Sequence, residues 1–211
     1  MRTIGILFLA LFPSLAFGEI SHIVVSAGGG QSHKTRHGQA DIQELNVELG
    51  KVFSPRTEVA FVVTPMNLWQ PRSWFGDQFG DGNETVRAIA ASALVRYRLN
   101  TDSSRLHVYG EAATGPMWAE KAIPASTSRF NFVTQLGAGV VLMPRSRFPL
   151  LAGYRFQHLS NGGYSPRNPG FNISTIVLGV QVRREKPREN PSSALRAPSP
   201  TAAGEGYLRA K

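Results

Sequence analysis

Alternation of apolar with polar or small residues is the main pattern of the chain from residue 20 to residue 183. Successive side chains of a strand point to opposite faces, so a period of two predicts β-strands with one apolar face. Eight segments follow this period: 20–28, 41–53, 57–64, 87–99, 105–115, 130–142, 149–160 and 171–183. No helical period competes with them, and the chain is predicted to be all-β.

The connections between these segments alternate between short and long. The short ones lie at residues 54–56, 100–104 and 144–148, and the long ones at residues 29–40, 65–86, 118–129 and 161–170. Short periplasmic turns, longer external loops and an even strand number are typical of bacterial outer-membrane barrels. We therefore expect an eight-stranded antiparallel up-and-down transmembrane β-barrel.

A soluble lipocalin-like cup has the same number of strands but the opposite sidedness. In segment 41–53, Leu45 and Val47 share one face, while Glu44 and Glu48 share the other. A narrow barrel fills its interior with side chains, so charges of both signs could pair there, whereas a ligand cup needs an apolar interior. The residues expected to form this interior network are Glu44, Glu48, Glu111, Arg96, Arg98 and Arg155. The apolar faces are then expected to contact lipid, with the soluble cup as the alternative.

The two ends of the chain predict segments outside the barrel. Residues 1–18 combine a basic start, an apolar run at 4–15 and small residues before position 19, which is the pattern of a secretory signal peptide. This run is shorter than the ~20 residues of a membrane-spanning helix. We expect cleavage after Gly18, a barrel domain at residues 19–185 and a disordered, Pro-rich periplasmic tail at residues 186–211.

Composition narrows the chemistry. The 211 residues fit one domain and include no cysteine, which excludes disulfides, thiolate nucleophiles and Cys-based metal sites. The net charge is +9, but the basic residues are scattered and seven of the 23 lie from residue 183 onward. We therefore expect no nucleic-acid partner.

Polar residues with catalytic potential gather at the end of segment 149–160. Period two places Phe156, His158 and Ser160 on one face, and Arg155 and Gln157 on the other. The second face matches the lumen, so His158 and Ser160 are expected to point toward lipid. Polar groups on that face are costly and are usually functional. The alternative is an interfacial histidine beside a strand-terminal serine.

A resemblance to a known family rests on two motifs, YRFQHLSNGG at residues 154–163 and NPGFN at residues 168–172. They resemble the signature of the outer-membrane lipid A 3-O-deacylases (PagL type, also called acyloxyacyl hydrolases). Residues 130–132 and 135–139 are similar to the family's sixth strand. The resemblance is specific mainly from residue 129 to residue 182. It implies a barrel enzyme of the outer membrane that hydrolyses an ester-linked acyl chain of lipid A, with lipopolysaccharide as its partner.

The resemblance also implies roles for individual residues. Ser160 would be the nucleophile and His158 the base that takes its proton. The side chain of Asn161 and the backbone N–H of Gly162 would stabilise the oxyanion. No metal or organic cofactor is implied.

One residue departs from the family pattern. The best-known form of the family has a glutamate where this chain has Asn172, and residues 157–181 include no Asp or Glu. An amide can orient the imidazole of His158 but cannot stabilise an imidazolium by charge. The second hypothesis is therefore a non-catalytic outer-membrane barrel with a structural or adhesive role.

The first long connection carries His33 and His37 in a basic stretch. Two histidines four residues apart suit a metal ion only on a helix, and the neighbouring Lys34 and Arg36 repel cations. An anionic phosphate partner fits better, and a solvated loop is the simplest interpretation.

The second long connection carries acidic and aromatic residues. Asp77, Asp81 and Glu84 could bind calcium, but their spacing does not match an EF-hand loop, and a solvated loop is expected. The aromatic residues Trp69, Trp74 and Phe75 in the same connection predict an interfacial anchor.

Overall fold

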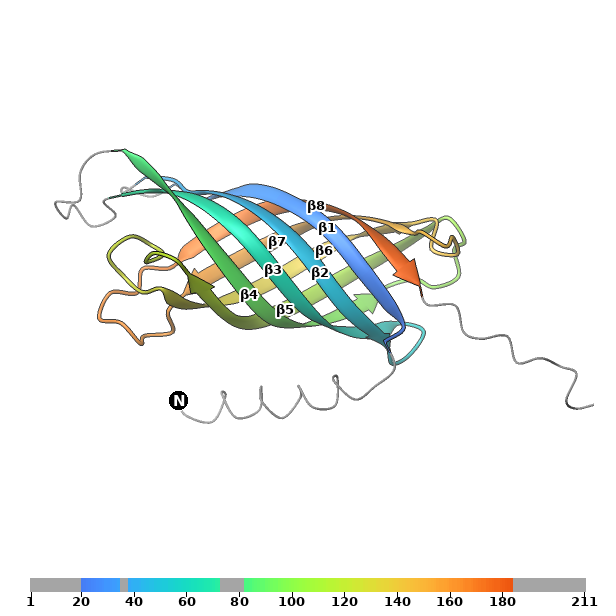
Figure 1. Cartoon of the computed structure of the whole chain (residues 1–211). Coiled ribbons are helices and arrows are strands. Elements are labelled where there is room, and N and C mark those ends of the chain that lie inside the picture. Colours follow the sequence, from blue (N-terminus) through green and yellow to red (C-terminus); the bar gives the residue numbers. More distant parts are fainter. Residues whose placement is uncertain (1–19, 35–37, 73–81, 184–211) are drawn as a thin grey trace, which may run out of the picture.

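The computed structural model describes residues 20–34, 38–72 and 82–183. They form the strands β1 (His22–Ser32), β2 (Asp41–Val52), β3 (Thr57–Pro71), β4 (Asn83–Arg98), β5 (Leu106–Ala119), β6 (Phe130–Leu142), β7 (Leu150–Ser160) and β8 (Phe171–Arg183). Each strand pairs with the next, and β1 pairs antiparallel with β8, which closes the barrel (Figure 1). The predicted fold class is confirmed. The predicted signal peptide and the tail from residue 186 lie outside the described residues.

Four strands, β1, β3, β4 and β5, run further at one end than the sequence pattern predicted. β3 continues to Pro71 instead of ending at residue 64, although Pro65 lacks the N–H that a strand ladder uses. Pairing between β2 and β3 is interrupted beside Pro65, between Glu44↔Met66 and Val47↔Val63, and this gap accommodates the proline. β1 continues to residue 32 through a glycine run that the sequence analysis assigned to a loop.

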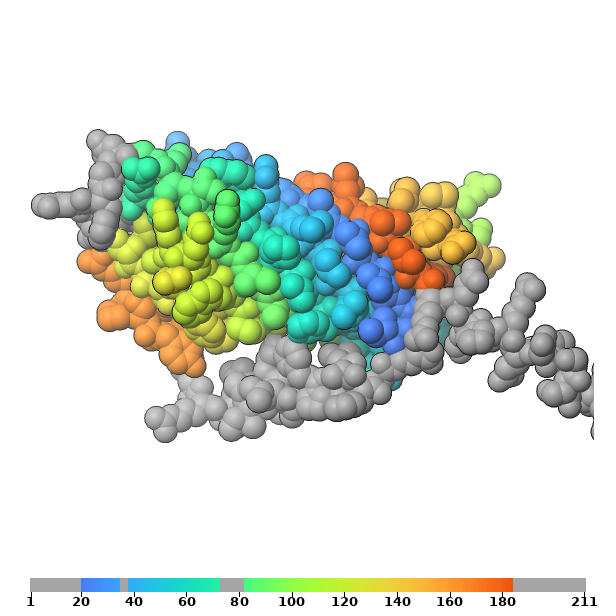
Figure 2. Space-filling view, viewed as in Figure 1, coloured from blue at the N-terminus to red at the C-terminus, as the bar shows by residue number. Residues whose placement is uncertain are grey.

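The exterior of the barrel is apolar. Leu136, Ile176 and Leu178 are 61%, 59% and 62% exposed, and they point outward from β6 and β8. Figure 2 shows the side chains of β1 to β4 forming a continuous outer wall. Among the described ranges, no helix is long and apolar enough to span a bilayer. Membrane barrels have their apolar face on the outside, whereas a soluble lipocalin-like cup has it on the inside. The apolar exterior therefore excludes the soluble cup.

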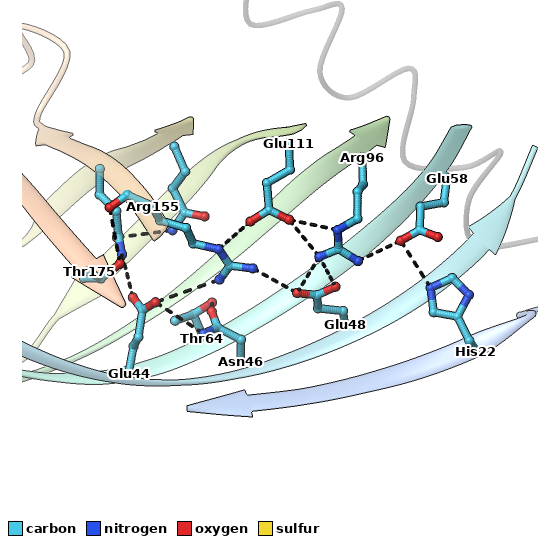
Figure 3. A network of polar contacts seen from close by, with 12 residues as sticks. His22, Glu44, Asn46, Glu48, Glu58, Thr64, Arg96, Glu111, Arg155 and Thr175 are labelled. Atoms are coloured by element: carbon cyan, nitrogen blue, oxygen red, sulfur yellow. Dashed lines mark hydrogen bonds and ion pairs between the residues drawn. The ribbon is translucent and has the colours of Figure 1, made fainter. Parts of the chain in front are cut away.

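The interior holds paired charges (Figure 3). Arg96 is fully buried and donates to Glu58 (2.7 Å), Glu48 (2.9 Å) and Glu111 (2.8 Å). Arg98 pairs with the second oxygen of Glu58. The predicted interior network is therefore confirmed, and Glu58 is an acidic member that the sequence analysis did not include.

Arg155 joins the two halves of this network. Its Nε donates to Glu111 (2.6 Å) and its Nη2 to Glu48 (3.0 Å), while Nη1 lies 3.9 Å from Glu44. Gln157, the next inward residue of β7, also donates to Glu44 (2.8 Å). The inward face predicted for Arg155 and Gln157 is confirmed, so the alternate residues of β7 point outward.

Replacing Arg155 tests this interior. Arg155→Leu leaves buried carboxylates without one partner, and we expect a loss of about 3 to 5 kcal/mol in the free energy of unfolding. The matched control is Arg87→Leu, because Arg87 is an exposed, outward residue of β4. Urea unfolding in detergent, followed by the heat-modifiable band, measures both variants. Equal stability of Arg155→Leu and the wild type would contradict the assigned facing of β7.

An apolar cluster fills the lumen at the end where the long connections lie. Leu159, Phe171 and Ile173 are at most 2% exposed and belong to this cluster. Full burial of such side chains stabilises a fold by roughly 1.5 to 3 kcal/mol each. The strand ends that carry the outward polar residues of β7 and β8 are thus fixed from inside.

Candidate active site

His158 and Asn172 lie opposite each other on neighbouring strands. They are direct register partners near the end of β7 and the start of β8, and both side chains are exposed on the outward face. Their inward neighbours are Leu159 and Phe171 of the apolar cluster. Period two in two well-packed strands therefore brings these two residues together on the outward face, which is the face predicted for His158.

A hydrogen bond of 2.7 Å joins His158 Nδ1 and Asn172 Oδ1. An amide oxygen only accepts hydrogen bonds, so Nδ1 is the donor and carries the proton. The neutral imidazole then has its lone pair on Nε2. This is the tautomer that a histidine needs in order to accept a proton from a serine hydroxyl.

Ser160 ends β7 on the same outward face as His158 and is half-buried. In the described part of the chain, no hydrogen bond joins its hydroxyl to the imidazole. Such contacts are often long in free enzymes and tighten when substrate binds. The structure thus places the two residues on one face without a direct bond.

Gly170 is a site residue that the sequence analysis did not assign a role. Leu159 pairs with Phe171 in the antiparallel register, so the residue before Phe171, Gly170, lies across from Ser160. A Cβ at Gly170 would lie 2.9 Å from Cε1 and 3.4 Å from Nε2 of His158, and its φ is +66°. Glycine therefore lets the imidazole edge lie over the backbone at the level of Ser160. A positive φ is typical of glycine, and the NPGFN motif was the available signal.

Asn161 organises the connection between β7 and β8. Its Nδ2 donates to Arg167 O (2.7 Å), its Oδ1 accepts from Gly163 N (2.9 Å), and its backbone N donates to Asn168 Oδ1 (3.0 Å). The side chain is 1% exposed. In this geometry the side-chain N–H and oxygen of Asn161, the residue expected as an oxyanion donor, both bond within the turn.

Gly162 follows in an exposed left-handed conformation with a φ of +62°. Its N–H donates to no group in the described part of the chain. A Cβ at this position would lie 3.3 Å from the ring of Phe132. The backbone N–H of Gly162 is thus an available donor two residues after Ser160.

Three aromatic rings lie beside Ser160 on the outward side. Phe132 is the register partner of Ser160 on β6, and its ring centroid is 5.2 Å from that of Phe130 and 6.1 Å from that of Tyr164. Tyr164 is 78% exposed. The rings form an apolar surface that begins at the serine and continues away from His158.

The other candidates from the second long connection are placed differently. Trp69 lies in β3, not in a loop, and points outward. Glu84 lies in β4, where its carboxylate accepts from Lys121 (2.8 Å) and Gln70 (3.1 Å), so it is occupied by protein donors. The other residues of the possible calcium site, Asp77 and Asp81, and of the expected aromatic anchor, Trp74 and Phe75, lie outside the described residues. His37 lies outside them as well. In the part described, no group of three potential metal ligands occurs.

These features define a class: an eight-stranded outer-membrane barrel with a serine, a histidine and an amide on its lipid-facing surface. A family model described as lipid A 3-O-deacylase (PagL) matches residues 56–181. The chain belongs to this family. The match includes β7 and most of β8, and therefore His158, Ser160 and Asn172.

The fold is similar to that of a solved surface protein. Neisserial surface protein A has a TM-score of 0.52 and 17% identity, over 77% of this chain and 97% of that one. The outer membrane enzyme PagL has a TM-score of 0.49 and 17% identity, over 76% of this chain and 99% of that one. No curated protein sequence gives a significant match.

Proposed function

We propose that this protein is an esterase that removes the acyl chain from the 3-position of lipid A. The observation that carries the proposal is the 2.7 Å hydrogen bond between His158 Nδ1 and Asn172 Oδ1, on the lipid face and beside Ser160. A buried, solvent-filled site is not needed, because the substrate is itself a membrane lipid. Membership of the deacylase family supplies the substrate class.

The proposed reaction uses His158 twice. Its Nε2 accepts the proton of Ser160 while Oγ attacks the ester carbonyl, and the resulting imidazolium gives the proton to the departing sugar hydroxyl. Water, activated by the same imidazole, then hydrolyses the acyl-serine and releases a free fatty acid. Asn172 holds the tautomer through both steps.

The oxyanion is proposed to be stabilised by the backbone N–H of Gly162. A donor aimed at the developing charge is often worth 10²- to 10³-fold in turnover. Asn161 contributes by fixing the turn that presents this N–H, through its bonds to Arg167 O and Gly163 N. Its role is thus to position a donor, and the expected catalytic residues remain Ser160, His158 and Asn172.

The acyl chain is proposed to lie along the outward face of β6, from the ring of Phe132 beside Ser160 toward Leu136, because this direction leads from the external end of the barrel into the bilayer. The sugar then lies on the other side of β7, over His158 and Asn172. Apolar contact along this surface positions the ester without burying it in a pocket. The same arrangement suits a substrate that diffuses in the plane of the membrane.

The location of the site matches the place of lipid A. Long connections of outer-membrane barrels face the cell exterior, and the site lies at that end of β7 and β8. We propose that residues 1–18 direct export and are removed, which leaves a mature chain that starts near Glu19.

Mass spectrometry of lipid A tests the function. Cells that express the protein are expected to lose the mass of one hydroxyacyl chain from lipid A, with release of the matching free fatty acid. Cells that produce an equal amount of folded Ser160→Ala protein serve as the control. Unchanged lipid A in cells with the wild-type barrel would favour the second hypothesis, a non-catalytic surface barrel. That hypothesis is motivated by the amide of Asn172 at the position where the family has a glutamate.

A further inference from the structure

His33 lies beside the proposed catalytic residues, although it comes from the other end of the barrel sequence. Its backbone N–H donates to Asn172 O (2.8 Å), which continues the pairing of β1 and β8 past Ser32. Its ring centroid is 5.7 Å from that of Phe156, the outward residue of β7 before His158. Two contacts thus fix an exposed imidazole next to the site.

No acidic side chain lies on the side of His33 that faces β8 and β7. Lys34 follows it and is exposed, and the whole segment 157–181 of β7, β8 and their connection has no acidic residue. The nearest carboxylate on the outward face of the neighbouring strand is Asp41, which pairs with Gln31 and so lies diagonal to His33. An anion that approaches Asn172 from outside the barrel therefore meets the nitrogen donors of His33 and Lys34. It meets no carboxylate from residues 157–181 of β7, β8 and their connection.

We propose that His33 and Lys34 bind a phosphate group of the glycolipid substrate and so place its sugar over Asn172 and His158. This inference rests on the proposed function and adds to it a specificity site for a phosphorylated headgroup. Both side chains donate hydrogen bonds, and the ammonium group of Lys34 adds charge. The backbones of His33 and His158 lie two strand spacings apart, about 10 Å, and the ring of His33 reaches across β8 toward Phe156.

The same geometry gives a reason for the amide at position 172. Asn172 contacts His158 through its side chain and His33 through its backbone, so its side chain lies between the imidazole and the proposed phosphate. A carboxylate at that position would repel the phosphate. An amide keeps the orienting hydrogen bond and removes the repulsion.

The experiment compares two purified lipids in detergent micelles: lipid A with both phosphates, and the same lipid A without its 1-phosphate. The variants are His33→Ala and Lys34→Gln, with Lys51→Gln as the control because Lys51 lies at the opposite end of β2. We expect each site variant to raise KM for the bisphosphorylated lipid about tenfold, and to lower its kcat/KM preference over the dephosphorylated lipid by a similar factor. His33→Gln, which keeps an N–H donor, should recover part of the preference.

Binding separates this proposal from catalysis. Ser160→Ala protein, with and without His33→Ala, is titrated with both lipids, and inorganic phosphate is added as a competitor. Preferential binding of the bisphosphorylated lipid that requires His33 supports the site even if no hydrolysis occurs. Equal binding of both lipids, or equal losses on both lipids in the His33 variants, would overturn it and assign His33 a purely structural role. Competition by millimolar inorganic phosphate supports direct phosphate contact, and its absence together with equal binding excludes it.

Discussion

Ser160→Ala is expected to reduce release of fatty acid from lipid A by about 10⁴- to 10⁶-fold, the range seen when a serine hydrolase loses its nucleophile. The loss follows from chemistry, because the other hydroxyl beside His158, that of Thr134 on β6, is held in a hydrogen bond with Thr114 (3.1 Å). The barrel should stay intact. The ladder of β7 uses backbone groups, and the substitution removes one oxygen from a half-buried strand end.

Ser174→Ala is the matched control for this experiment. Ser174 is an outward serine of β8, and its hydroxyl bonds to Tyr154 (2.7 Å) at a position two residues from Asn172. The two variants remove the same atom from the same face of the barrel. Both proteins should show the heat-modifiable band of the wild type, and only Ser160→Ala should lose turnover. Substantial hydrolysis by Ser160→Ala would mean that His158 activates water directly and that no acyl-serine forms.

Strand parity explains what the sequence could predict about this site. Once Arg155 and Gln157 are assigned to the lumen, period two forces His158 to the exterior, and the same counting puts Asn172 on that face of β8. β7 and β8 are consecutive antiparallel strands, so His158 near the end of one pairs with Asn172 near the start of the other. The facing of both residues and the charge network inside the barrel were therefore accessible from local patterns.

Other features depend on contacts that a pattern does not contain. The burial of Asn161 results from a turn in which three of its polar atoms bond within the same connection. The place of His33 depends on the closure of the barrel, since β1 meets β8 only after six other strands. Glycine at 170 is explained by its positive φ together with the imidazole that lies against it. Sequence motifs marked two of these positions, but tertiary packing decides their roles.

Asn172→Glu is expected to raise kcat by about 10- to 100-fold. Replacing the acid of a Ser-His-Asp triad by an amide costs about 10⁴-fold in turnover, largely through the wrong tautomer. Here the amide oxygen already accepts from His158 Nδ1, so the tautomer is correct and only the charge is missing. A carboxylate would stabilise the imidazolium that forms during attack by Ser160. The cost of a charge near the membrane interface is small.

Asn172→Gln isolates the contribution of charge, because glutamine has the length of glutamate without its charge. We expect kcat to rise for Asn172→Glu and not for Asn172→Gln, measured as fatty acid release from purified lipid A in detergent across the pH range of histidine titration. If His33 and Lys34 hold a phosphate, Asn172→Glu should also raise KM for bisphosphorylated lipid A more than for the dephosphorylated lipid. An equally folded Asn172→Glu protein with no gain in kcat at any pH would show that stabilising the imidazolium does not limit this reaction, and that the amide costs this enzyme nothing.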